Sequence, residues 1–235
     1  MTWRGIVGVV KPGLGLGSTE EFIRLLPEGI GVIPTRASIN EYNADGFRAA
    51  LDSYREKVAE LAALGKCDLI HPEGAPPFMV RGFTGEQQIV QEWEEEYKVP
   101  VFTSGMVCAE ALRALGIHRF IGFSSFGGPL PEIFANYYKE AGFDVVGMEM
   151  YPEEVRTPEA KYGYIKKEFL KHRDVQGIYQ LGSGAGQVRD LVVPIEEDLG
   201  VPFVHPIAAR VWYVQKRLHV RQPVQGNGRL LEVFP

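Results

Sequence analysis

The most constraining feature of this sequence is the regular alternation of short apolar runs with longer segments whose apolar residues recur every three or four positions. Short apolar runs bounded by turn residues are typical of buried strands, and the longer spacing is typical of amphipathic helices. Their alternation predicts repeated strand–helix units and an α/β fold with parallel sheets. The predicted strands are Gly5 to Val10, Gly31 to Pro34, Cys67 to His71, Pro100 to Thr103, Arg119 to Ser124, Asp144 to Met150, Gly177 to Leu181 and Pro202 to His205.

Helices are predicted between these strands. Ser18 or Thr19 is expected to cap a helix from Glu20 to Leu26, with Glu21 placed as in a capping box. The other predicted helices are Asp45 to Leu64, Gly85 to Tyr97, Val107 to Leu115, Pro131 to Ala141, Pro158 to His172 and Gln187 to Leu199. The segment from His219 onward lacks helical periodicity, which favours a wrapping tail or a dimer contact.

Composition narrows the class of protein. The 235 residues are 45% apolar and 23% charged, and no apolar run approaches the length of a membrane helix, which indicates a soluble globular protein. A net charge of −5 argues against nucleic-acid binding, which needs a basic surface. The N-terminal residues are typical of a first strand and not of a signal peptide. Two cysteines are too few for a disulfide framework, and none has zinc-ligand spacing, so we expect a reducing cytoplasm.

The chain contains an internal repeat. EEEYKVPVFTS, from Glu94, matches EEDLGVPFVHP, from Glu196, and a strand ending in a glycine-containing turn precedes each, PEG at 72–74 and GSGAG at 182–186. A repeat of roughly a hundred residues suggests two similar half-domains. The cleft between such halves is then the expected place for a ligand.

Four stretches, GIVGVVKPG, ALRALGIHRFIGFSS, GIYQLGSGAG and EEDLGVPFVHP, resemble the aspartate/glutamate racemase superfamily, nearest the branch that holds arylmalonate decarboxylase and maleate isomerase. The resemblance implies two pseudo-symmetric α/β half-domains, each with a four-stranded parallel sheet flanked by helices, a ligand cleft between them, and no metal or organic cofactor. The expected halves are residues 1–105 with 207–235, and residues 106–206, with exchange of terminal segments. A homodimer or higher homo-oligomer is the expected assembly.

The sequence departs from this family at the positions of its two active-site cysteines, which fall at about Gly74 and Gly182. Cys67 and Cys108 lie elsewhere and are expected to be core residues. The resemblance aligns the family's hydroxyl-bearing residues for a leaving carboxylate with Ala75, Pro76 and Phe126. Neither the cysteine mechanism nor that pocket therefore carries over.

Ionisable residues at strand ends are the candidate replacements. Glu73 follows the strand that ends at His71, and a raised pKa from partial burial would let it act as general acid or base. The alternative is that Glu73 caps the loop or pairs with an arginine such as Arg81, and that His71 is a hydrogen-bonded core residue. His205, at the end of the last strand, is the third catalytic candidate, with a structural strand-end role as the alternative.

Substrate-binding candidates surround these residues. The loop with Gly182, Ser183 and Gly184 opens a helix and could hold a carboxylate, although glycines there can also serve only the turn. Arg36, with Thr35, could clamp an acid, or form a surface ion pair. Lys11 is either a source of positive charge or a solvated loop residue. The remaining candidates are Gly74, Ala75, Ser104, Ser125 and Phe126.

Two functions are consistent with these features. The first is a cofactor-independent enzyme on a small carboxylic acid, of the decarboxylase (lyase) or isomerase/racemase type, that transfers a proton next to a carboxylate with non-cysteine groups. The second is a catalytically silent relative that keeps the scaffold and binds a carboxylate. Ionisable residues at the strand ends favour the enzyme, and loss of both cysteines favours the silent relative.

Overall fold

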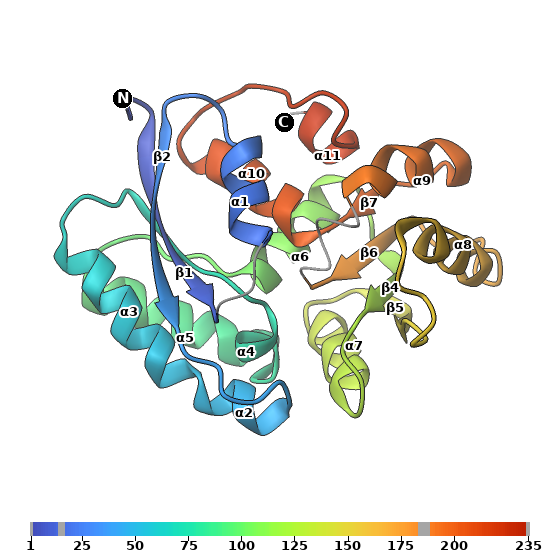
Figure 1. Cartoon of the computed structure of the whole chain (residues 1–235), viewed down its shortest axis with the longest axis horizontal. Coiled ribbons are helices and arrows are strands. Elements are labelled where there is room, and N and C mark those ends of the chain that lie inside the picture. The colour runs from blue at the N-terminus through green and yellow to red at the C-terminus, as the bar shows by residue number, and fades with distance from the viewer. Residues whose placement is uncertain (1, 14–16, 183–188, 234–235) are drawn as a thin grey trace.

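The computed structural model contains two parallel β-sheets, one in each half of the chain (Figure 1). It describes residues 2–13, 17–182 and 189–233. The first sheet has the order β2-β1-β3 and the second the order β5-β4-β6-β7. The strands are β1 (Gly5–Pro12), β2 (Ile30–Ala37), β3 (Leu69–Pro72), β4 (Arg119–Ser124), β5 (Asp144–Met150), β6 (Gly177–Leu181) and β7 (Phe203–Val204). The prediction of an α/β fold with two parallel sheets is confirmed.

The first sheet has three strands where four were expected. In place of a strand from Pro100 to Thr103, a single parallel bridge joins Ile70 to Val101. The backbone N–H of Phe102 donates to the carbonyl of Ile70 at 3.0 Å, and the N–H of Ile70 donates to Pro100 at 2.9 Å. Pairing stops there because Thr103 is already the N-cap of the next helix.

Helices cover both sheets. They are α1 (Ser18–Leu25), α2 (Ala44–Ala49), α3 (Leu51–Ala63), α4 (Pro76–Met79), α5 (Gly82–Tyr97), α6 (Ser104–Ala114), α7 (Leu130–Glu140), α8 (Pro158–Phe169), α9 (Val192–Leu199), α10 (Pro206–Arg217) and α11 (Arg229–Glu232), with a 3-10 turn at Arg189–Leu191. The helix predicted from Asp45 to Leu64 is interrupted at Ala50, and α6 begins at Ser104, earlier than expected. Among the described residues, no helix combines the length and apolar character that crossing a bilayer requires.

The predicted cap of α1 was wrong. The N-cap is Gly17, whose N–H donates to the carboxylate of Glu20 at 2.8 Å. Ser18 and Thr19 are instead the first two residues of the helix, and their hydroxyls contact side chains from other parts of the chain. A glycine with φ of 109° can occupy the cap without the strain that a side chain would bring there.

Helix α10 was not predicted, although it links the two halves. It follows β7 of the second sheet and packs against α1, α6 and α11, so it lies at the centre of the molecule (Figure 1). Every residue from Pro206 to Gln215 is buried. The segment PIAARVWYV therefore has almost no side facing solvent, and its single charge is Arg210.

The internal repeat has the same local structure in both copies. The carboxylate of Glu94 accepts a hydrogen bond from the N–H of Val101 at 2.8 Å, and Glu196 accepts from Phe203 at 2.9 Å. The preceding helices both end at a left-handed residue, Lys98 in one copy and Gly200 in the other. These matched contacts show that the two copies of the repeat share one local structure, as the sequence predicts.

Candidate active site

A cavity of about 140 Å³ is lined by residues of both halves. It lies where β1, β3 and β6 end, since Lys11 and Pro12 finish β1, Glu73 follows β3 and Gly182 follows β6. Gly74 and Gly182, the two positions expected to meet across a shared hollow, both line it. Both have positive φ, 105° and 92°, which favours glycine at each.

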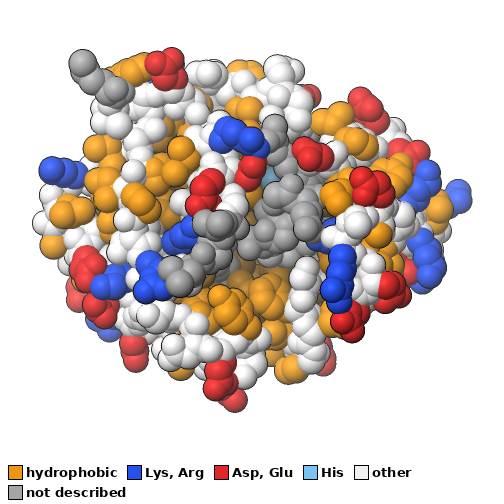
Figure 2. Space-filling view, viewed as in Figure 1, with side chains coloured by type: hydrophobic (Ala, Val, Ile, Leu, Met, Phe, Trp, Pro, Cys, Tyr) orange, Lys and Arg blue, Asp and Glu red, His pale blue; other side chains and the backbone are white. Residues whose placement is uncertain are grey.

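The wall of the cavity is mostly apolar. Figure 2 shows hydrophobic side chains gathered along the lower edge of a hollow near the middle of this face. The apolar lining includes Pro12, Ile39, Phe47, Pro76, Phe126 and Ile207, and the polar lining is Lys11, Ser18, Tyr42, Glu73, Ser104 and Arg210. Such a lining suits a small molecule with an apolar substituent and one or two polar groups.

Within the described residues, three helices of eight residues or more begin at this cavity, beside the four-residue α4, which begins at Pro76. Ser18 is the first residue of α1, Ser104 of α6 and Pro206 of α10, and all three line it. The N-terminus of a helix carries partial positive charge and unpaired N–H groups, so it favours a bound anion. The convergence of three such ends makes the cavity electrostatically suited to a carboxylate.

Glu73 lines the cavity as half of a buried ion pair. Its Oε1 lies 3.1 Å from Nη1 of Arg210, and its Oε2 accepts a hydrogen bond of 2.6 Å from the Thr19 hydroxyl. Burial alone would raise the pKa of Glu73, but Arg210 and the Ser18 and Thr19 hydroxyls outweigh it and hold the pKa below its usual range. The expectation of a raised pKa was therefore wrong, and the arginine that pairs with Glu73 is Arg210, not Arg81.

His71 is a neutral, hydrogen-bonded core residue. Its Nδ1 lies 2.8 Å from the carbonyl oxygen of Phe102, which can only accept, so Nδ1 carries the proton. Its Nε2 is left to accept from the Ser104 hydroxyl at 3.4 Å and from Arg210 at 3.5 Å. Burial and the charge of Arg210 lower the pKa of His71 to about 3. The histidine does not line the cavity and orients two groups that do.

His205 is also withdrawn from the cavity. It is the N-cap of α10, is 2% exposed and has no hydrogen-bond partner for Nδ1 among the described residues. Burial, followed by the charge of Arg210, lowers its pKa to about 4. The expectation that it titrates near neutrality beside a ligand was wrong, because complete burial favours the neutral imidazole.

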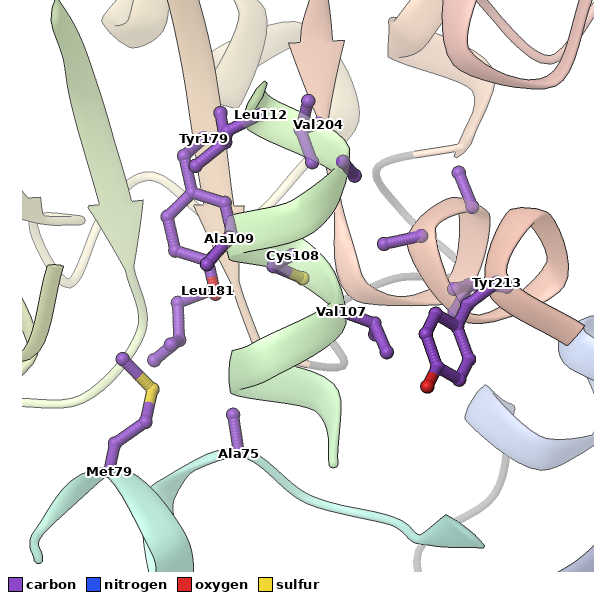
Figure 3. Close-up of a cluster of buried hydrophobic side chains, with 14 of the residues drawn as sticks. Ala75, Met79, Val107, Cys108, Ala109, Leu112, Tyr179, Leu181, Val204 and Tyr213 are labelled. Carbon is purple, nitrogen blue, oxygen red and sulfur yellow. The ribbon is translucent and has the colours of Figure 1, made fainter. Parts of the chain in front are cut away.

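Neither thiol reaches the cavity. Cys108 lies within α6, in an apolar cluster with Tyr179, Leu181 and Val204 (Figure 3), and burial raises the pKa of its thiol to about 12. Cys67 precedes β3, at the opposite end of that strand from Glu73, and burial raises its pKa as well. Cys108 is the buried core residue that the sequence predicts, whereas Cys67 is only partly buried and packs against the core.

The other predicted binding residues fall into two groups. Gly74, Ala75, Ser104, Phe126 and Gly182 line the cavity. Thr35, Arg36 and Ser125 do not line it. Arg36 and Ser125 are exposed, and Thr35 and Arg36 lie on β2, an edge strand one position further from the cavity than β1. Ser183 and Gly184 lie outside the described residues.

Arg210 is the cavity residue that the sequence did not reveal, because it lies in the helix that was missed. The only signal is a lone charge in the apolar segment PIAARVWYV, where a buried arginine requires a buried acidic partner. Within the described residues, no cluster of three metal-ligating side chains is present.

Comparison with known proteins places the chain in a family. A family model described as arylmalonate decarboxylase matches residues 8–231. No curated protein sequence matches the chain.

Solved structures share the fold over nearly the whole chain. Maleate isomerase Iso from Pseudomonas putida S16 superposes with a TM-score of 0.86 at 18% identity, covering 97% of this chain and 98% of that one. An arylmalonate decarboxylase superposes with a TM-score of 0.81 at 21% identity, covering 96% and 98%. Nocardia farcinica maleate cis-trans isomerase gives 0.84 at 20% identity, covering 97% and 98%.

Proposed function

Because the chain belongs to the arylmalonate decarboxylase family, we propose that it is a cofactor-independent enzyme that acts on a small carboxylic acid with an aryl or branched alkyl substituent. The reaction is of the decarboxylase or isomerase type, with proton transfer at the carbon next to a carboxylate. The observation that carries the proposal is the convergence of three helix N-termini, at Ser18, Ser104 and Pro206, on one largely apolar cavity.

The helix N-termini and the apolar wall have different roles in the proposed reaction. The helix ends attract the carboxylate and also stabilise the negative charge that develops when a proton or carbon dioxide leaves the adjacent carbon. The apolar wall holds the substituent and keeps water away, which strengthens those electrostatic interactions. General acid–base catalysis alone contributes only about 10² to 10⁴-fold, so this preorganised charge is an essential part of the proposal.

The proton is transferred by a group other than a thiol, since neither Cys67 nor Cys108 lines the cavity. His71 and His205 do not line it either, and the carboxylate of Glu73 is held by Arg210 and Thr19. The hydroxyls of Ser18, Tyr42 and Ser104 and the ammonium of Lys11 are the remaining proton-bearing side chains of the described lining.

A thermal-shift screen of malonates, maleate, hydantoins and hydroxy or amino dicarboxylates tests the proposal, followed by NMR in D₂O on every compound that binds. We expect at least one to lose carbon dioxide, change configuration or gain deuterium next to its carboxylate. Binding with none of these outcomes overturns the enzyme proposal.

That outcome would support the second candidate, a carboxylate-binding relative without catalysis. The specific observation in its favour is the burial of all three predicted catalytic side chains, Glu73, His71 and His205, of which Glu73 and His71 are held by protein partners.

A further inference from the structure

Within the described residues, two cationic side chains line the cavity, Lys11 and Arg210. They differ in the number of N–H donors that remain available to a ligand. Each N–H of Arg210 has a protein acceptor. Nε donates to the Pro206 carbonyl at 3.2 Å, and Nη2 donates to Ser18 Oγ at 2.8 Å and to the Ser18 carbonyl at 3.4 Å. Nη1 faces Glu73 at 3.1 Å and His71 at 3.5 Å. A guanidinium has five N–H donors, so Arg210 has none to spare.

The charge of Arg210 is compensated as well. Its partner Glu73 is an ionised carboxylate, and both side chains are almost fully buried. A ligand carboxylate would have to displace Glu73 to bind here and would leave a buried anion unpaired, which is costly. Arg210 is therefore a structural residue of the cavity wall and is unsuited to binding a ligand.

Lys11 is in the opposite situation. Its ammonium has three donors, and the one ion pair that it makes with the described residues is with Glu20 at 3.1 Å. The Glu20 side chain is 55% exposed, so solvent weakens this pair. Glu20 is also held independently of Lys11, since it accepts the N–H of Gly17 at 2.8 Å. Lys11 can exchange this partner for a ligand without disturbing the start of α1.

We propose that Lys11 is the carboxylate-binding residue of the cavity and confers its preference for acids over neutral molecules of the same shape. Lys11 finishes β1 and shares the cavity lining with Ser18, the first residue of α1, so an acid there meets the ammonium and a helix N-terminus together. Because one cation of the described lining is available, we expect it to bind one carboxylate of the ligand. The remainder of the ligand then packs against the apolar wall. The inference rests on the proposed function only in taking a carboxylic acid as the ligand.

The test measures binding of phenylacetate and of its neutral isostere phenylacetamide by calorimetry, in wild type and in four variants. In Lys11→Met we expect the dissociation constant for phenylacetate to rise by about tenfold or more, with that for phenylacetamide changed less than about twofold. Lys11→Arg should retain most of the acid preference. Glu20→Gln, which keeps an acceptor for Gly17 but removes the competing charge, should bind phenylacetate more tightly than wild type.

The matched control is Lys66→Met. Lys66 is exposed and precedes β3, at the end of that strand remote from the cavity, so it produces the same change in net charge without touching the site. We expect it to bind both compounds as wild type does. Raising the salt concentration should weaken phenylacetate binding in wild type and much less in Lys11→Met.

The outcomes separate the two proposals. If phenylacetate binds wild type and Lys11→Met equally, the role of Lys11 is overturned and the proposed function is untouched. If acids bind through Lys11 but none is turned over, the enzyme proposal falls and the role of Lys11 stands. If no acid in the screen or the calorimetry binds wild type, both are overturned.

Discussion

Nη1 of Arg210 lies 3.1 Å from Oε1 of Glu73, and the two side chains are only 1% and 5% exposed. One partner comes from the loop after β3 and the other from α10, so the pair joins distant segments of the chain beneath the cavity.

Glu73→Gln should destabilise the protein by about 3–5 kcal/mol, because it leaves the guanidinium buried without a counter-ion. Urea unfolding measures this. The double variant Glu73→Met, Arg210→Met should cost less than the single one, since it removes both charges.

Asp45→Asn, which breaks the exposed pair with Arg48, is the control and should cost under about 1 kcal/mol. A cost that small for Glu73→Gln would contradict the structural role of the pair. Any loss of activity in this variant must be judged against its stability.

Glu86 should make the protein less stable as the pH rises from about 4.5 to 7. Burial raises its pKa from the ordinary value of 4.5 to about 7, against the opposing hydrogen bond from the Tyr137 hydroxyl. Between these values the folded state keeps a proton that the unfolded state has lost, so stability falls with pH through this window and the full penalty remains above it.

Glu86→Gln removes this titration while keeping an acceptor for the Tyr137 hydroxyl. Its stability relative to wild type should therefore increase across the window, by up to about 3 kcal/mol at pH 8 compared with pH 4. Urea unfolding of both proteins at several pH values measures the difference. A difference that is independent of pH would mean that burial does not shift the pKa of Glu86.

Cysteines introduced at the two glycine turns, Gly74 and Gly182, should be tolerated unequally. A Cβ at Gly182 would lie 3.4 Å from Phe126, an ordinary contact, whereas a Cβ at Gly74 would lie 3.0 Å from the Tyr54 hydroxyl. That hydroxyl cannot move away easily because it donates to the Glu73 carbonyl at 2.6 Å. Both positive φ values cost about 1–2 kcal/mol for a non-glycine residue. We expect Gly74→Cys to have the lower thermal midpoint; the reverse order would show that the Tyr54 contact does not matter.

The two repeat-related glutamates should respond differently to amidation. Glu94 accepts one backbone N–H, from Val101, so Glu94→Gln can keep its contact through the amide oxygen and should be nearly neutral. Glu196 uses both oxygens, for Phe203 and for Arg229 at 2.8 Å. In Glu196→Gln one N–H faces an amide donor, which should cost about 1.5–3 kcal/mol in urea unfolding. Equal costs for the two variants would indicate that the Arg229 contact contributes nothing.

The fold was largely predictable because its signals are local. Apolar runs such as the one that became β6 are bounded by turn residues, and the repeat at Glu94 and Glu196 exposes the two-half design directly. Helix α10 was missed because it begins with an apolar segment, PIAARVWYV, that carries a single charge and directly follows a predicted strand. Arg210 was missed along with it.

The candidate site was predictable in position but not in chemistry. The ends of parallel strands located Gly74 and Gly182 at one cavity. The protonation states of Glu73, His71 and His205 depend instead on burial and on Arg210, a contact between remote segments that no local pattern encodes. The capping prediction for Ser18 and Thr19 failed for the same reason. Their hydroxyls contact Arg210 and Glu73, which are distant in sequence, instead of capping α1.

The cavity draws Lys11 and Ser18 from near the start of the chain and Ile207 and Arg210 from near its end. During synthesis on a ribosome, the early strands can pair long before α10 emerges, but Glu73 then has no counter-ion and the cavity lacks part of its wall. Competence to hold a ligand is therefore acquired only after α10 has been synthesised, and ligand capture by nascent chains of increasing length would report when the two halves have joined.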